Sequence, residues 1–167
     1  MKDLHFKKFY YAKMTEIRNN PFYTEILQNL YMGDKGEVIS YLQFCYQSFM
    51  LLPFGSELGN VFEKIANEDF LHMKLLSERI ISFGGNPIFS NSQGIWLGGR
   101  SINYCKDKKS MLLTGIEFKE NALINYKTAF RKVEDKNLKN VFKIIILDEE
   151  VHLAKLKECL NKINFKY

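Results

Sequence analysis

Two short stretches decide the fold of this chain: residues 65–72, Ile-Ala-Asn-Glu-Asp-Phe-Leu-His, and residues 147–152, Leu-Asp-Glu-Glu-Val-His. In each stretch a histidine follows an acid by three residues, which gives the pairs Asp69/His72 and Glu149/His152. Residues three apart on an α-helix share a face, so each pair presents a carboxylate and an imidazole in one direction. Two such pairs on facing helices form the core of a carboxylate-bridged dimetal site in a four-helix bundle. The two stretches therefore predict an all-α fold with a metal site inside it.

Proline and glycine mark the ends of four long predicted helices. The helices cover about 22–52, 56–82, 107–133 and, after a turn at 134–137, a stretch that reaches about 161. Gly33 and Gly36 lie inside the first helix and are expected to weaken it without breaking it. The short connections predict two antiparallel helical hairpins, and the long connection at 86–106 predicts a crossover along the bundle. We expect one domain at 21–162, an ordered arm at 1–20 packed on it and a tail at 163–167.

Apolar residues at steps of three and four predict the buried face of each helix. On the second and fourth helices, the acid and the histidine of each pair lie on that buried face. Glu37 lies on the same face of the first helix as Tyr41 and Phe44. Charged groups in a bundle core are costly unless they are paired or bound to metal. The alternative is that the acids lie at the surface and the assumed helix phase is wrong. We favour a metal site whose candidate ligands are Glu37, Asp69, His72, Glu149 and His152.

The third helix departs from a complete dimetal site. Its predicted buried face includes Ile116, position 119, Leu123 and Tyr126, and a carboxylate is needed at 119, where this chain has Lys119. Glu117 and Glu120 are close in sequence, but they project about 200° and 100° away around the helix. Neither is expected to replace the missing ligand in a regular helix.

These motifs resemble the bacterial ferritin-like proteins, related to rubrerythrins, bacterioferritins and manganese catalases, over about residues 20–162. Within that superfamily the chain is most similar to small stand-alone domains of the clostridial type. The resemblance implies a ferritin-like four-helix bundle with ligands Glu, Glu-x-x-His, Glu and Glu-x-x-His from successive helices. Glu37, His72, Glu149 and His152 match this pattern. Asp69 stands where the bridging Glu is expected, and Lys119 where the third-helix Glu is expected, so the resemblance implies a degenerate dimetal site.

The departures change the charge of the site. Three carboxylates and one ammonium leave a net charge of −2, which suits one divalent ion or none. Charged lysine has no lone pair to give a metal. Three states remain open. The site holds no metal, with Lys119 paired to Glu149 or Asp69, or it holds one iron or manganese ion at Glu37, Asp69, His72 and optionally Glu149. The third state has two ions, which requires Glu120 to turn inward or Lys119 to move out. We expect one ion or none rather than two.

Three functions therefore stay open: an iron or manganese oxidoreductase (ferroxidase, peroxidase or catalase type), a structural or interaction module, and a one-ion metal binder. Oxygen or peroxide would be a partner only of a metal-loaded site, and no catalytic residue is assigned. Candidates for supporting the ligands are Tyr41, Tyr126 and Glu120. For the two tyrosines, plain core packing is the expectation.

The bulk properties limit the partners. The net charge is +5, but the basic residues are scattered and no groove-reading motif is present, so no nucleic-acid partner is expected. Met1 to Tyr11 lacks the apolar core of a signal peptide, and no stretch is long and apolar enough to span a membrane. The unpaired spacing of Cys45, Cys105 and Cys159 predicts free thiols, which favours the cytoplasm. The resemblance implies a homodimer.

Overall fold

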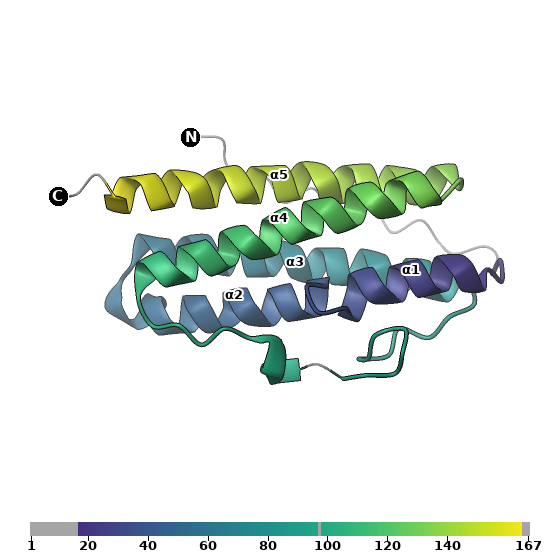
Figure 1. Cartoon of the computed structure of the whole chain (residues 1–167), viewed down its shortest axis with the longest axis horizontal. Coiled ribbons are helices and arrows are strands. Elements are labelled where there is room, and N and C mark those ends of the chain that lie inside the picture. The colour runs from purple at the N-terminus through teal and green to yellow at the C-terminus, as the bar shows by residue number, and fades with distance from the viewer. Residues whose placement is uncertain (1–16, 97, 165–167) are drawn as a thin grey trace.

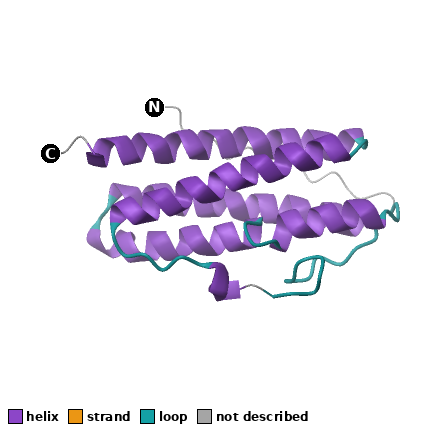
Figure 2. Ribbon diagram, viewed as in Figure 1, coloured by secondary structure: helices purple, strands orange, loops and turns teal. Residues whose placement is uncertain are grey.

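The computed structural model describes residues 17–96 and 98–164, and within them the chain is helical with no strand. Most of the arm expected at 1–20 lies outside these residues. Figures 1 and 2 show long helices lying along one common direction. The elements are α1 (Pro21–Met32), α2 (Glu37–Leu51), the short 3-10 turn η1 (Leu52–Phe54), α3 (Glu57–Ser82), the 3-10 turn η2 (Gly98–Ser101), α4 (Lys108–Lys132) and α5 (Lys136–Asn164).

The first helix is broken, so the expectation of one continuous helix over 22–52 is wrong. The segment 33–36 separates α1 from α2, and the two helices lie end to end in Figure 1. Gly33 closes α1 by donating its N–H to the Asn29 carbonyl. A Cβ on Gly36 would lie 2.8 Å from the backbone nitrogen of Gly33 and 2.9 Å from the Leu30 carbonyl oxygen. The backbone folds back too tightly here for any side chain, and Glu37 becomes the first residue of α2.

The other helix ends follow the sequence signals. The N–H of Gly84, at φ 80°, bonds the Ile81 carbonyl, and that of Gly85 bonds the Ile80 carbonyl, which is a Schellman C-terminus. Asp107 caps α4 by accepting from the Ser110 N–H. The last helix extends three residues beyond the predicted end at 161. Arg18 and Asn20 bond the Ser82 and Phe83 carbonyls, so the described end of the arm follows the end of α3.

Three buried glutamines hold the crossover between α3 and α4 against the first hairpin. Gln28 donates to the Ile88 and Ser90 carbonyls. Gln43 donates to the Asn103 carbonyl at 3.0 Å and accepts from the Asn103 N–H at 2.8 Å. Gln47 donates to the Met111 carbonyl at the start of α4. All three glutamines contact backbone groups, so they fix the path of the crossover whatever side chains it carries.

The apolar core forms two clusters, and the candidate metal site lies between them. One cluster includes Leu76 and Ile145, and the other includes Ile65 and Leu156. On α3 and α5 the polar residues Asp69, His72, Glu149 and His152 therefore fall between apolar residues of the two clusters. The predicted buried faces of α3 and α5 are confirmed. None of the described helices is apolar over enough of its length to cross a membrane.

Candidate metal centre

Four helices, α2, α3, α4 and α5, each contribute a buried polar group to one place in the core. Glu37 begins α2, Asp69 and His72 lie in the middle of α3, and Glu149 and His152 lie in the middle of α5. Lys119 enters from α4. None of these six side chains is more than 3% exposed. The assumed helix phase is correct, and the alternative of surface acids is wrong.

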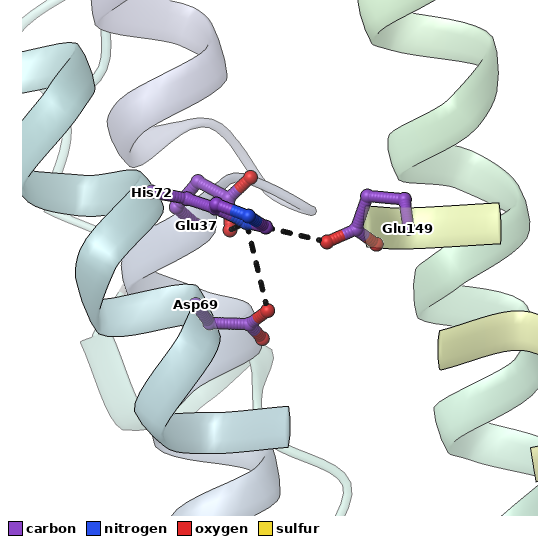
Figure 3. A group of neighbouring side chains, drawn as sticks. All are labelled: Glu37, Asp69, His72 and Glu149. Atoms are coloured by element: carbon purple, nitrogen blue, oxygen red, sulfur yellow. Dashed lines mark ion pairs between the residues drawn. The ribbon is translucent and has the colours of Figure 1, made fainter. Parts of the chain in front are cut away.

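Four of the predicted ligands form a compact group. Glu37, Asp69, His72 and Glu149 each offer one ligand atom, and these atoms lie within 4.8 Å of one another (Figure 3). His72 Nδ1 lies 3.5 Å from Glu37 Oε2, 3.5 Å from Glu149 Oε1 and 4.0 Å from Asp69 Oδ1. It is a buried nitrogen with no hydrogen-bond partner among the described residues. A lone nitrogen facing three carboxylate oxygens is an arrangement that a cation can complete.

The fifth predicted ligand, His152, faces the same oxygens but is not part of that compact group. Its Nδ1 lies 3.5 Å from Glu149 Oε1 and 4.0 Å from Asp69 Oδ1, and it also lacks a hydrogen-bond partner in the described chain. Its Nε2 lies 2.6 Å from Glu68 Oε2. The contact with Glu68 fixes the ring so that Nδ1 is directed toward the centre.

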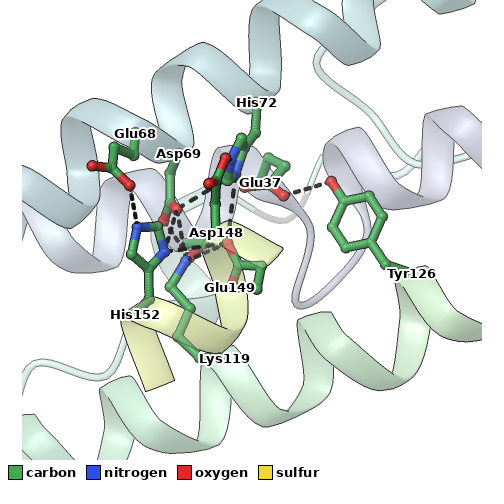
Figure 4. Close-up of polar contacts among 10 residues, drawn as sticks. Glu37, Glu68, Asp69, His72, Lys119, Tyr126, Asp148, Glu149 and His152 are labelled. Atoms are coloured by element: carbon green, nitrogen blue, oxygen red, sulfur yellow. Dashed lines mark hydrogen bonds and ion pairs between the residues drawn. The ribbon is translucent and has the colours of Figure 1, made fainter. Parts of the chain in front are cut away.

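Lys119 fills the space between the two central carboxylates. Its Nζ lies 2.6 Å from Asp69 Oδ1, 3.1 Å from Glu149 Oε1 and 3.2 Å from the Ser40 hydroxyl (Figure 4). We call Asp69 Oδ1 and Glu149 Oε1 the central oxygens. The two ion pairs that sequence reasoning treated as alternatives, with Glu149 or with Asp69, form together.

The charges of the cluster shift the pKa of each member. Burial raises the pKa of Asp69 to about 6, against the opposing charge of Lys119. Burial also favours neutral Glu149, but Lys119 and the two histidines outweigh it and hold the pKa of Glu149 well below its usual range. Burial favours a neutral lysine, yet Asp69 and Glu149 raise the pKa of Lys119 above its usual value. At neutral pH the centre therefore contains a charged ammonium between ionised carboxylates.

Both histidines are more basic than usual when no metal is bound. Burial opposes protonation of His72, but the charge of Glu37 and contacts with Asp148, Glu149 and Glu37 raise its pKa well above 6.5. Burial likewise opposes protonation of His152, but Glu149 and Glu68 raise its pKa to about 8. A metal ion bound by either ring must therefore displace a proton.

Hydroxyl groups orient the carboxylates. Tyr126 donates to Glu37 Oε1 at 2.5 Å, and Ser40 donates to Asp69 Oδ2 at 2.7 Å. Each hydroxyl holds one oxygen, and the other oxygen of each carboxylate faces the centre. Tyr126 was a candidate for supporting the ligands although plain packing was expected, and its contact with Glu37 agrees with the supporting role. Sequence reasoning missed Ser40, although its position three residues after Glu37 places it on the same helix face.

Two of the supporting candidates are not at the site. The ring of Tyr41 packs against the ring of Phe70, with the two centroids 5.8 Å apart. This contact agrees with the expectation that Tyr41 has a packing role. Glu120 forms an ion pair with Lys157 on the surface between α4 and α5, with Lys157 Nζ 2.7 Å from Glu120 Oε1. Glu120 is 48% exposed at its side chain, so it does not supply the carboxylate that position 119 lacks.

The donor set suits a metal ion. Ligand atoms about 2.1 Å from a tetrahedral ion lie about 3.4 Å apart, and octahedral neighbours lie closer. The separations of 3.5 Å from His72 Nδ1 to Glu37 and Glu149 approach the tetrahedral spacing. Mixed imidazole and carboxylate ligands suit iron and manganese. The chemistry and the spacing of these residues agree with an iron or manganese site.

Comparisons with known proteins agree with this architecture. No family model matches the sequence. A probable manganese catalase of Clostridium acetobutylicum is 25% identical, over 87% of this chain and 73% of that protein. The crystal structure of a manganese catalase from Anabaena superposes with a TM-score of 0.83 at 21% identity, covering 96% of this chain and 81% of the other.

A second kind of bundle matches as well. The bacterioferritin of Rhodobacter capsulatus, in a structure described with a metal-free dinuclear site and haem iron, superposes with a TM-score of 0.75 at 18% identity over 89% of each chain. At these identities the two structures establish the fold. The sequence relationship, the shared four-helix bundle and the buried Glu/Asp/His cluster together identify the chain as a member of the ferritin-like superfamily.

Proposed function

We propose that this protein binds one divalent iron or manganese ion through Glu37, Asp69, His72 and Glu149. The observation that carries the proposal is His72 Nδ1, which is buried, has no hydrogen-bond partner in the described part of the chain and faces three carboxylate oxygens. Without a metal ion this nitrogen makes only long ion pairs of 3.5–4.0 Å with the carboxylates, and a bound metal ion would replace them with coordination bonds. The relationship to a probable manganese catalase and the bacterioferritin fold support the choice of metals.

The residues around the four ligands prepare them for such an ion. Tyr126 holds Glu37, Ser40 holds Asp69, and Asp148 Oδ2 lies 3.5 Å from His72 Nε2. Partners of this kind orient ligands, and their loss typically weakens metal binding by about 10–100-fold. When bound, an iron or manganese ion supplies Lewis acidity and one-electron redox chemistry. The chain contributes the orientation of the ligands and the exclusion of water.

A structural role without metal is the second candidate. Lys119 already pairs with both central oxygens, so the carboxylates are partly neutralised by the chain itself. In that case the buried network would specify how the helices pack, as buried ion pairs do in some proteins. An active dimetal oxidoreductase is the third candidate. The related catalases favour it, and Lys119 would have to leave the centre for it to operate.

Metal content decides among these candidates. We would purify the protein without chelator, load it anaerobically with Fe²⁺ or Mn²⁺, and count ions per chain by plasma mass spectrometry. One ion per chain, lost in His72→Gln and kept in the surface control Glu117→Gln, is the expected result. No ion after loading would favour the structural role, and two ions would favour the oxidoreductase.

A further inference from the structure

The two histidines are arranged symmetrically about the central oxygens. The Nδ1 of His72 and that of His152 each lie 3.5 Å from Glu149 Oε1 and 4.0 Å from Asp69 Oδ1. Both nitrogens lack hydrogen-bond partners among the described residues. The bundle therefore builds two cation positions that share the same pair of oxygens. One position is on the His72 side and the other is on the His152 side.

The two positions differ in their third acidic group. On the His72 side, Glu37 Oε2 lies 3.5 Å from the ring nitrogen. On the His152 side, Glu68 is committed to the far nitrogen of the ring, and α4 supplies Lys119 instead of a carboxylate. Figure 4 shows Lys119 beside His152, with Glu37 and Tyr126 at the other end of the cluster.

The ammonium of Lys119 is fully satisfied where it lies. An ammonium has three N–H donors, and Lys119 donates to three acceptors, Asp69 Oδ1, Glu149 Oε1 and Ser40 Oγ. The Phe44 ring centroid lies 5.0 Å from Nζ and adds a cation–π contact. The lysine side chain is completely buried. No donor is left free, so the side chain gains nothing by moving away from the centre.

We infer that the Lys119 ammonium is a built-in cation that takes the place of a metal ion on the His152 side, so that the centre holds at most one ion. The ammonium supplies positive charge to the central oxygens and cannot be removed by a chelator. The inference concerns the site of the proposed function and rests on it only for the ion on the His72 side. The dimetal centre implied by the superfamily does not fit this chain, because the ammonium bonds both oxygens that the two ions would share.

Two substitutions at one position test the inference. Lys119→Glu removes the ammonium and restores a carboxylate, and we expect it to bind one more Mn²⁺ per chain than the wild type. Lys119→Met removes the ammonium without adding a ligand, and we expect its metal-free form to melt more than about 5 °C below the metal-free wild type. Added Mn²⁺ should raise the melting temperature of Lys119→Met more than that of the wild type. Lys127→Met, which removes an exposed lysine paired with Glu150, is the control and should change neither quantity.

Each result supports or overturns the inference. Two Mn²⁺ ions in the wild type, or no additional ion in a folded Lys119→Glu, would overturn it. If Lys119→Glu does not fold, an unchanged metal-free melting temperature of Lys119→Met overturns it, and a lowered one that Mn²⁺ restores supports it. No ion in the wild type together with a gain in Lys119→Glu would refute the proposed function and leave this inference standing.

Discussion

Tyr126 on α4 donates a hydrogen bond of 2.5 Å to Oε1 of Glu37, the first residue of α2. The bond leaves Glu37 Oε2 facing His72 Nδ1, so a buried tyrosine of the core determines the direction of a candidate ligand. We predict that Tyr126→Phe keeps the fold and weakens Mn²⁺ binding by about 10–100-fold, the usual effect of losing a group that orients a ligand. Isothermal titration of the metal-free protein measures the affinity.

Tyr31→Phe is the control for this substitution. Tyr31 is also buried, but it lies on α1 and its ring stacks on Phe89, with centroids 6.0 Å apart. Equal affinities for the two variants would show that the Tyr126 hydroxyl does not position Glu37.

Ser40 connects the acid and the ammonium. Its hydroxyl donates to Asp69 Oδ2 at 2.7 Å and accepts from Lys119 Nζ at 3.2 Å. Ser40→Ala leaves a carboxylate oxygen and an ammonium proton unpaired in the core, and we expect a loss of about 1–3 kcal/mol in the free energy of unfolding. Urea denaturation checks this.

The matched control is Ser48→Ala, on the same helix. Ser48 is equally buried, but its hydroxyl donates to the Cys45 carbonyl within its own helix. We expect Ser48→Ala to change the free energy of unfolding by less than about 1 kcal/mol. Losses of the same size in both variants would contradict the role of Ser40.

The metal-free protein should lose stability between about pH 6.5 and 8. The pKa of His152 is about 8 in the folded protein and 6.5 ordinarily, so the folded state binds the proton more tightly. A raised pKa contributes stability that is complete below pH 6.5 and is lost as the pH rises through 8. The loss for His152 is about 2 kcal/mol, and His72 acts in the same direction.

Urea denaturation with a chelator at pH 6 and pH 8.5 measures this loss. His152→Gln should reduce the difference between the two pH values, because glutamine does not titrate. A wild-type protein that becomes more stable toward pH 8.5 would refute the assignment of these protonated histidines.

Gly36 is required at the break in the first helix. A Cβ there would lie within 3 Å of backbone atoms of Gly33 and Leu30, and backbone cannot move aside cheaply. We predict that Gly36→Ala lowers the free energy of unfolding by about 1–3 kcal/mol. Gly99→Ala is the control, since its Cβ would meet only the end of the Tyr104 side chain. Thermal unfolding compares them, and a stable Gly36→Ala would mean that the segment can form continuous helix.

The parts of the site that sequence predicted are those set by helix periodicity. Steps of three and four residues predicted which face of α3 and α5 is buried, and so identified Asp69, His72, Glu149 and His152. The same steps on α4 showed that Lys119 occupies a position where a carboxylate was expected. Whether these residues bind metal stays a prediction.

The parts that sequence missed depend on contacts between helices. The break at 33–36 depends on how closely the backbone turns back on itself, which glycine content alone does not reveal. Tyr126 was a candidate for supporting the ligands, but its specific contact with Glu37 depends on how α4 packs against α2, which no pattern within one helix predicts. The approach of Lys119 to both carboxylates, rather than to one, likewise follows from the spacing of α3, α4 and α5.

The glutamines that hold the crossover have a consequence for how this protein can diverge. Because Gln28, Gln43 and Gln47 bind main-chain groups, the side chains of the crossover are not what they recognise. Changes of exposed crossover side chains, such as Gln93 and Arg100, can therefore accumulate without breaking these bonds, whereas an insertion or deletion would shift the carbonyls away from the glutamines. Descendants of this chain should vary in the amino acids of the crossover between α3 and α4 and preserve its length.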